Sequence, residues 1–168
     1  MNRKTKFFSL LLSAVVSLGS LHAQQIEAPT IKGESSFAVI VDTKTYEMCR
    51  EQISLYKQTI ESEGLPVFVV ADDWQTPEQV RAQIKKLYTE NALEGCVFVG
   101  DIPVVLVQYA QHLTSAFKMD QRENPIRDCS VPSDRYYDDL DLIFDRIESE
   151  PNQGLLHFFT MSPDSPQY

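Results

Sequence analysis

Short apolar runs alternate with longer helical segments in the first two thirds of the chain, and this alternation is the strongest constraint on the fold. Three runs, at residues 37–41, 67–70 and 96–99, have the length and composition of buried strands. The segments between them, at residues 45–63 and 76–94, have helical periodicity. Short connections in a β-α-β-α-β order require parallel strands. The sequence therefore predicts an α/β fold with a three-layer, doubly wound parallel sheet.

The pattern of apolar and charged residues predicts which sides of the helices are buried. In the first helix the apolar positions recur at three- and four-residue steps, and they are Cys49, Ile53, Tyr56 and Ile60. Glu51, Lys57 and Glu61 fall on the other side, which predicts that all three face solvent. The second helix begins at Thr76, which has the spacing of a capping box with Gln79. We expect both helices to pack one face against the sheet.

The first 23 residues have the pattern of a secretory signal peptide. Three cations precede an apolar run at residues 7–18, and Ala23 is a small residue at the expected cleavage position. The run is shorter than the ~20 residues of a membrane-spanning helix. We expect cleavage after Ala23; the alternative is an uncleaved N-terminal anchor. Residues 24–36 are then a leader, and residues 37–168 an α/β domain of a secreted, periplasmic or cell-surface protein with no membrane association.

The charge balance narrows the range of partners. The chain has a formal net charge of −9, and loss of residues 1–23 removes three cations and no anions, so the mature charge is −12. Such an acidic protein is not expected to bind nucleic acid or anionic lipid. The balance suits an exported protein that binds divalent cations.

Acidic residues follow each of the three predicted strands. These residues are Asp42, Asp72, Asp73 and Asp101. Ligands gather at the carboxyl ends of parallel strands, so one prediction is a cation site or acid–base chemistry at this edge. The alternative is that these aspartates are ordinary turn and helix N-cap residues. Nucleotide binding is not expected, because no glycine-rich loop follows the first strand.

A second acidic cluster lies in the segment VPSDRYYDDLD, at residues 131–141. Its carboxylates are Asp134, Asp138, Asp139 and Asp141. Calcium prefers six to eight oxygen ligands, so these four residues are the candidate metal site, with calcium as the cofactor. The spacing is not that of an EF-hand. The alternative is a solvated acidic loop in which Tyr136 or Tyr137 packs into the core.

The cysteines and histidines do not form a recognisable catalytic pair. Cys49 and Cys96 fall in a predicted helix and strand and are expected to be buried thiols, whereas Cys129 falls in a polar loop. Three cysteines in an exported chain do not indicate a disulfide framework. His112 lies in a polar stretch and His157 in an apolar run that reads as a strand. We therefore expect no catalytic residue within this chain.

Two motifs carry a family resemblance: FVGDIP at residues 98–103 and VPSDRYYDDLD at residues 131–141. Together with the export signal and the β-α-β-α-β order, they resemble the N-terminal part of the gingipain-like cysteine peptidases of Bacteroidetes bacteria, over about residues 37–145. The resemblance implies a caspase-like fold, here incomplete, with a Cys/His dyad at the strand ends. It also implies polypeptide substrates and structural calcium.

The chain departs from that family at the positions that matter for catalysis. The family's histidine, in an H-G loop, and its nucleophilic cysteine lie downstream of the second motif, and no position here matches either. Leu142 also replaces the glycine that commonly follows D-L-D. The leading hypothesis is a secreted gingipain-like N-terminal portion that is inactive alone and meets polypeptide substrates only within a full domain. The alternative is a secreted, acidic, noncatalytic binding module with a flavodoxin-like sheet.

Overall fold

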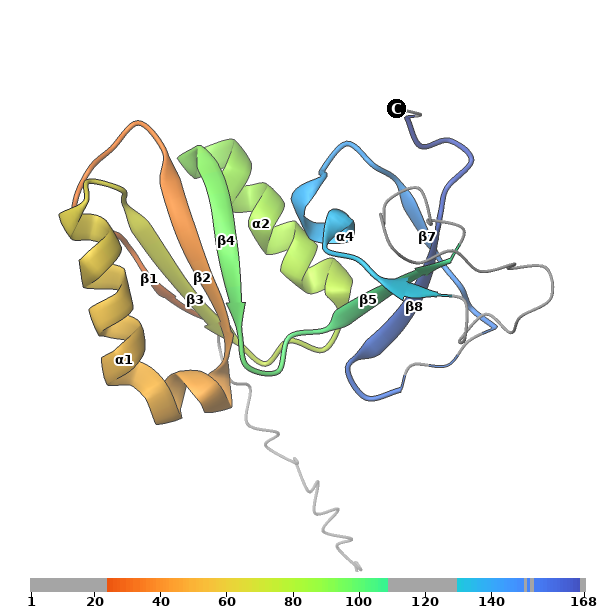
Figure 1. Ribbon diagram of the computed structural model, residues 1–168, viewed down its shortest axis with the longest axis horizontal. Coiled ribbons are helices and arrows are strands. Elements are labelled where there is room, and N and C mark those ends of the chain that lie inside the picture. Colours follow the sequence, from red (N-terminus) through yellow and green to blue (C-terminus); the bar gives the residue numbers. More distant parts are fainter. Residues whose placement is uncertain (1–23, 109–129, 150, 152, 167–168) are drawn as a thin grey trace, which may run out of the picture.

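The computed structural model describes residues 24–108, 130–149, 151 and 153–166. Within them it has two four-stranded sheets and three helices (Figure 1). The first sheet contains β1 (Gln25–Glu27), β2 (Ser36–Asp42), β3 (Val67–Asp72) and β4 (Leu93–Val99). The second contains β5 (Val104–Gln108), β6 (Val131–Pro132), β7 (Phe144–Arg146) and β8 (Leu156–Met161). The helices are α1 (Thr43–Ser62), α2 (Pro77–Asn91) and α4 (Arg135–Asp138).

The first sheet confirms the predicted parallel unit. Its order is β1-β3-β2-β4, and the central β2 runs parallel to both β3 and β4. The sequence did not predict β1, which pairs antiparallel with β3 from within the leader. It also placed the start of β4 too late: α2 ends at Asn91 and the following Ala92 takes a left-handed conformation, so Gly95 lies inside the strand and does not end the helix.

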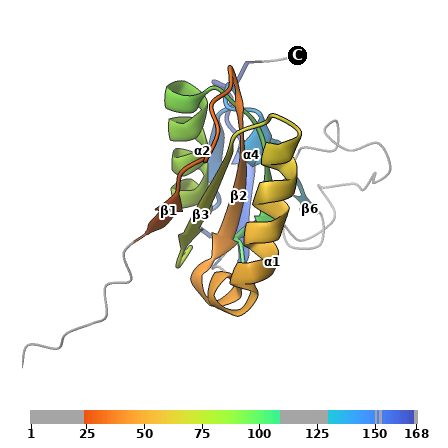
Figure 2. The same cartoon turned by 90° about the vertical axis from the view of Figure 1, so that its left-hand side faces the viewer.

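The two long helices cover opposite faces of the first sheet (Figure 2). One face packs with α1, and its buried residues include Val39, Val41, Val67, Val69 and Ala71. The other packs with α2, and its buried residues include Ala38, Ile40 and Val70. The alternation of neighbouring residues between the two faces is the two-residue period of a strand, and the central strands β2 and β3 are mainly apolar because both faces are covered.

The buried side of α1 differs from the prediction. Lys57 and Glu61 are 5% and 6% exposed, whereas Tyr56, predicted to be buried, is 46% exposed. The backbone is not helical at Cys49 (φ −119°, ψ 22°), which marks a kink before the buried stretch of the helix. The buried stripe instead runs through Ile53, Lys57 and Glu61 at four-residue steps.

The two buried charged side chains of α1, Lys57 and Glu61, make hydrogen bonds with backbone groups of two other segments. Lys57 Nζ donates to Ala28 O and to Val67 O, the latter at 2.9 Å, and lies 3.5 Å from Glu61 Oε1. Glu61 accepts from Thr30 N at 3.0 Å and from Val67 N at 3.3 Å. The pair therefore ties the segment after β1 and the start of β3 to the helix, which explains how two charged side chains are tolerated in the core.

The remaining strands form a separate mixed sheet and do not extend the first one. Its order is β6-β5-β8-β7; β5 and β8 are parallel, and the outer strands are antiparallel to them. One apolar core joins this sheet to α2 and to the first sheet, and it includes Trp74, Ile102, Val107, Tyr136 and Phe159. The class is thus α/β with two mixed sheets. None of the described helices is long and apolar enough to cross a membrane.

Candidate functional site

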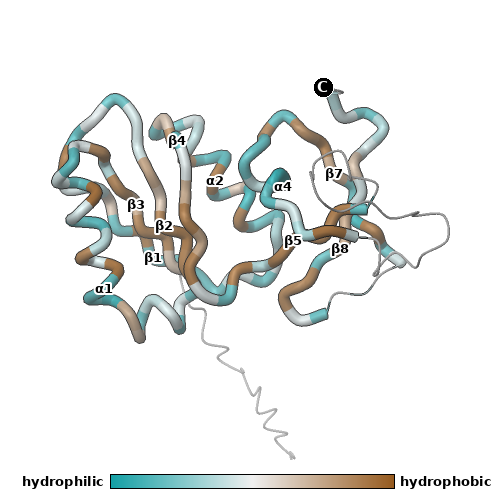
Figure 3. The backbone as a smooth tube through the Cα atoms, viewed as in Figure 1, coloured by the Kyte–Doolittle hydropathy of each residue, from teal (hydrophilic) through white to brown (hydrophobic). Residues whose placement is uncertain are grey.

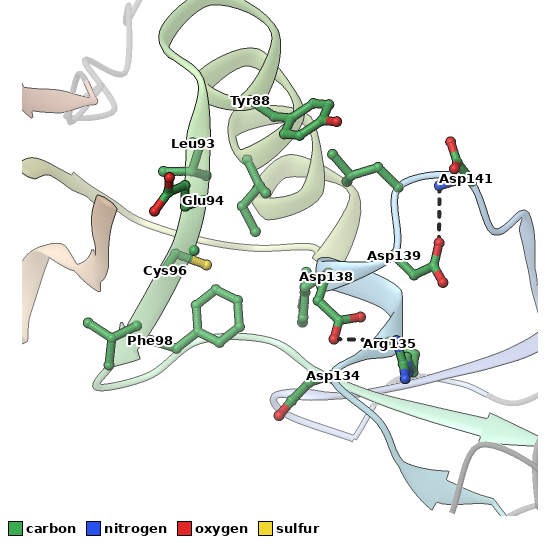
Figure 4. Close-up of a pocket in the computed structure, with 15 residues that line it drawn as sticks. Tyr88, Leu93, Glu94, Cys96, Phe98, Asp134, Arg135, Asp138, Asp139 and Asp141 are labelled. Carbon is green, nitrogen blue, oxygen red and sulfur yellow. Dashed lines mark hydrogen bonds and ion pairs between the residues drawn. The ribbon is translucent and has the colours of Figure 1, made fainter. Parts of the chain in front are cut away.

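A groove of about 760 Å³ lies between β4 and the segment around α4 and is the candidate site (Figure 4). One wall is β4 with Ile84 and Tyr88 of α2, and the other is the segment from Asp134 to Asp141. Apolar lining residues are Ile84, Leu93, Val97, Phe98 and Leu140. Charged lining residues are Glu94, Asp134, Arg135, Asp138, Asp139 and Asp141. The hydropathy of the chain follows this division, since the tube is brown along β4 and teal around α4 (Figure 3). The groove therefore combines an apolar strand with a mainly acidic opposite wall.

The two sequence motifs meet at this groove. Tyr137, in the second motif, is 4% exposed, and its hydroxyl donates to Pro103 O of the first motif at 2.6 Å. Its ring also lies edge-on to Phe98 of the first motif, with 5.0 Å between centroids. Burial raises the pKa of Tyr137 well above its ordinary value, so the phenol stays protonated and keeps its role as a donor. One tyrosine thus fixes the distance between the walls.

The neighbouring Tyr136 anchors the acidic wall to the second sheet and to α2. It is 3% exposed, and its ring packs against Phe144 and Phe159, with centroids 5.3 and 4.8 Å away. Arg81 of α2 stacks over the same ring at 5.0 Å and donates to Asp139 O at 3.0 Å. The prediction that Tyr136 or Tyr137 packs into the core is therefore confirmed, and here both of them do so.

The four candidate calcium ligands line the groove but do not converge. Asp134, Asp138 and Asp141 are exposed and Asp139 is half-buried. Asp138 lies 3.9 Å from Arg135 Nη1, and Asp139 accepts a hydrogen bond from Asp141 N at 3.3 Å. Among the residues that the structure describes, no three acidic, histidine or cysteine side chains are placed to hold a metal ion. The segment as arranged does not form a calcium cage, and calcium binding stays a prediction.

We expect Asp134→Ala to change the free energy of unfolding by less than about 0.5 kcal/mol, because this exposed side chain makes no cap hydrogen bond to α4. Urea unfolding, measured once with calcium and once with a chelator, checks this. Asp145→Ala, at an exposed carboxylate of β7, is the matched control. A loss of stability that is confined to the calcium-containing sample would contradict this result and would support a calcium site.

At the acidic edge where the parallel strands end, the central carboxylate, that of Asp42, already accepts hydrogen bonds from the protein's own backbone. Asp42 is 6% exposed, and its carboxylate accepts from Thr45 N at 2.9 Å as the N-cap of α1 and from Asp101 N at 2.8 Å. Burial raises the pKa of Asp42, but these hydrogen bonds outweigh it and hold the pKa below the ordinary value. Asp72 accepts from its own neighbour, Asp73 N, at 2.8 Å. For Asp42, the structural reading of the sequence is therefore confirmed.

The described thiols and imidazole are not arranged for nucleophilic catalysis. Cys96 is half-buried in the groove, and burial, followed by the charges of Asp134 and Asp138, raises its pKa to about 11. Cys49 is also half-buried, on α1. His157 is 2% exposed, and its Nδ1 lies 3.3 Å from Arg146 Nη1. Cysteine–histidine hydrogen bonds are absent from the part of the chain that the structure describes.

The other candidates from the sequence, Cys129 and His112, lie outside the described residues. Sequence reasoning missed the β4 wall of the groove and the contribution of Ile84 and Tyr88. The sequence showed that β4 and these two positions of α2 are apolar. It did not show whether another strand would pair with the outer side of β4, because that depends on the order of the strands and periodicity does not predict strand order.

Comparisons with protein-family models, curated proteins and solved structures found no match for this chain. The function of the groove has to be inferred from its own residues.

Proposed function

We propose that this chain is a secreted, gingipain-like protein whose described α/β part is a noncatalytic scaffold that binds polypeptide. One observation carries the proposal: the two motifs behind the resemblance are joined beside a single groove, which is lined by Phe98 of the first motif and by the acids of the second, and the thiol in that groove has no histidine partner among the described residues. Tyr137 joins the motifs through Pro103 and Phe98. With a pKa of about 11, Cys96 is protonated at neutral pH.

The arrangement of the first sheet supports the family part of the proposal. Parallel strands β3, β2 and β4 lie between α1 and α2, which is the layering of a caspase-like or flavodoxin-like domain. In this proposal the signal peptide at residues 1–23 exports the protein, and the α/β part supplies binding and not bond cleavage. A peptidase of this family would need a Cys/His dyad from outside the described residues.

The purified protein is expected to leave a library of fluorogenic peptides uncut, because no described cysteine has a histidine partner. Thiol labelling gives a second readout. A shift of the Cys96 pKa from 9.0 to about 11 lowers its thiolate fraction at pH 7 about 100-fold, so iodoacetamide should modify it far more slowly in the folded than in the urea-unfolded protein. Mass spectrometry of the labelled peptide checks this, with Cys96→Ser as the control for site assignment. If the protein hydrolyses peptides and Cys96→Ser or Cys129→Ser abolishes this activity, the proposal that it is noncatalytic is wrong.

A further inference from the structure

A buried imidazole and a guanidinium are in contact in the second sheet, outside the groove. His157 of β8 is 2% exposed, and its Nδ1 lies 3.3 Å from Nη1 of Arg146 on β7. The guanidinium of an arginine has hydrogen-bond donors only, so Nδ1 has to accept this hydrogen bond. The imidazole of the folded protein is therefore neutral and carries its proton on Nε2.

The same guanidinium joins the second sheet to α2. Nη2 of Arg146 donates to both carboxylate oxygens of Glu78, at 2.6 and 2.7 Å, and Nε donates to Glu78 Oε1 at 3.1 Å. Cζ of Arg146 also lies 4.8 Å from the centroid of the Phe159 ring. That ring packs against Tyr136, which anchors the acidic wall of the groove. One side chain thus connects the imidazole, the first turn of α2 and the packing behind the groove wall.

The surroundings of His157 oppose its protonation. Burial, followed by the charge of Arg146, lowers the pKa of His157 from its ordinary value of 6.5, and the charge of Glu78 acts in the opposite direction. Glu78 keeps its charge in mild acid. Burial raises the pKa of Glu78, but hydrogen bonds, first that from Arg146, outweigh it and hold the pKa below its ordinary value of 4.5. Between these two values, only the imidazole of this cluster titrates.

The other elements that pack against β8 bring no further charge to the imidazole. β5, which pairs with β8, contains no titratable residue. Asp145 of β7 is exposed and, as the neighbour of Arg146 along the strand, points to the opposite face of the sheet. Arg81 of α2 stacks over aromatic rings at 5.0 and 5.7 Å. The charged residues of α4, Arg135 and Asp138, line the groove.

We propose that His157 makes the docking of the second sheet against α2 sensitive to mild acid. A proton on Nδ1 makes the imidazole a cation and a donor that faces the cationic donor Arg146, so the guanidinium has to move away. Its hydrogen bonds to Glu78 and its stacking on Phe159 are then lost together. β7 and β8 separate from α2, whereas the first sheet, which contains no member of this cluster, stays folded. Because Phe159 supports Tyr136, the separation also loosens one wall of the groove.

Amide hydrogen exchange at about pH 7.5 and about pH 5.5, corrected for the intrinsic effect of pH on exchange, tests the proposal. In the open state His157 titrates near its ordinary value and binds the proton more readily than in the closed state. Opening should therefore become up to about tenfold more frequent at the lower pH. The faster exchange should appear in β7 and β8 and not in β2 or β3. An NMR titration of the His157 ring protons should give a pKa below 6.5.

Two variants separate titration from a purely structural role of these side chains. His157→Gln keeps a polar side chain that stays neutral, and it should reduce the acid effect on exchange to less than about twofold. Glu78→Gln removes the partner of Arg146 and retains the imidazole. It should speed exchange of β7 and β8 at both pH values and keep the acid effect, because removing the carboxylate does not make protonation of His157 easier. The measured quantity is the ratio between the two pH values, so a general loss of stability in either variant does not hide the result.

The possible failures are distinguishable. An acid effect of less than about twofold in the wild type, or one that His157→Gln retains in full, overturns the role of His157. Equal acceleration in β2 and β3 overturns the separation of the second sheet, because it shows that the whole chain unfolds. A pKa of His157 at or above 6.5 contradicts the neutral imidazole. The experiment contains no peptide, so its outcome is independent of the proposed polypeptide-binding function.

Discussion

Gly100→Ala is expected to destabilise the protein by roughly 3–5 kcal/mol, a large part of the stability of a typical domain. Gly100 has φ +82°, in the left-handed region that an alanine rarely adopts. An added Cβ would lie 2.8 Å from Thr45 Cβ and closer still to Asp42 Oδ2. The clash would displace the Asp42 carboxylate, which caps α1 and accepts from Asp101 N, and would leave two partly buried backbone donors unpaired.

The chain provides a matched control for this substitution. Gly64 also has a positive φ, at +94°, but a Cβ there would meet no atom within 4 Å. Gly64→Ala should therefore cost only the backbone strain of about 1 kcal/mol. Urea unfolding of both variants separates strain from clash. Equal losses for the two variants would show that the packing of Gly100 against Asp42 is not important.

Glu61→Leu is expected to cost roughly 3–5 kcal/mol, because it leaves Lys57 as an unpaired charge in the core. The substitution also removes the acceptor for Thr30 N and Val67 N, so the segment after β1 and the start of β3 lose one of the two side chains that join them. Glu51→Leu, at an exposed carboxylate on the same helix, should change stability by less than about 0.5 kcal/mol. Similar losses at the two positions would contradict the burial of the pair.

The same pair predicts a dependence of stability on pH. Burial raises the pKa of Glu61, but hydrogen bonds from the Thr30 side chain and backbone, and then from Val67, outweigh it and hold the pKa below its ordinary value of 4.5. A group with a lowered pKa stabilises the fold above its unfolded pKa, and this contribution is lost as the pH falls through the folded pKa. The wild type should lose stability as the pH falls below about 4.5, and Glu61→Gln should show a shallower loss.

The elements of the fold followed from local patterns. The strands β2, β3 and β4 and the capping box of α2 were predicted because apolar periodicity and cap spacing are properties of neighbouring residues, although β4, at the edge of its sheet, is mostly half-buried and not buried as expected. The same reasoning failed for Lys57 and Glu61. Their outward placement assumed that charged side chains face solvent, whereas carbonyl and amide partners from distant segments hold both of them in the core.

The candidate site was predictable only in part. The segment at residues 131–141 was singled out for its acids and tyrosines, and it does form one wall of the groove. The acids were expected to gather around calcium, but in the structure the tyrosines turn inward to the core and the carboxylates spread along the surface. The alternative interpretation had already placed a tyrosine in the core, and the packing of Tyr136 and Tyr137 against rings from other elements confirms that part of it, while calcium binding stays a prediction.

The sequence by itself determined the α/β class, the parallel β-α-β-α-β unit and the acidic character of the second motif. Only the tertiary structure decided that β5 to β8 form a second sheet, that β4 is left as an edge, and that the two motifs meet across a groove. The physical reason is the range of the interactions. Periodicity and capping act within a few residues, whereas strand order and the partners of buried charges depend on contacts between residues far apart in the chain.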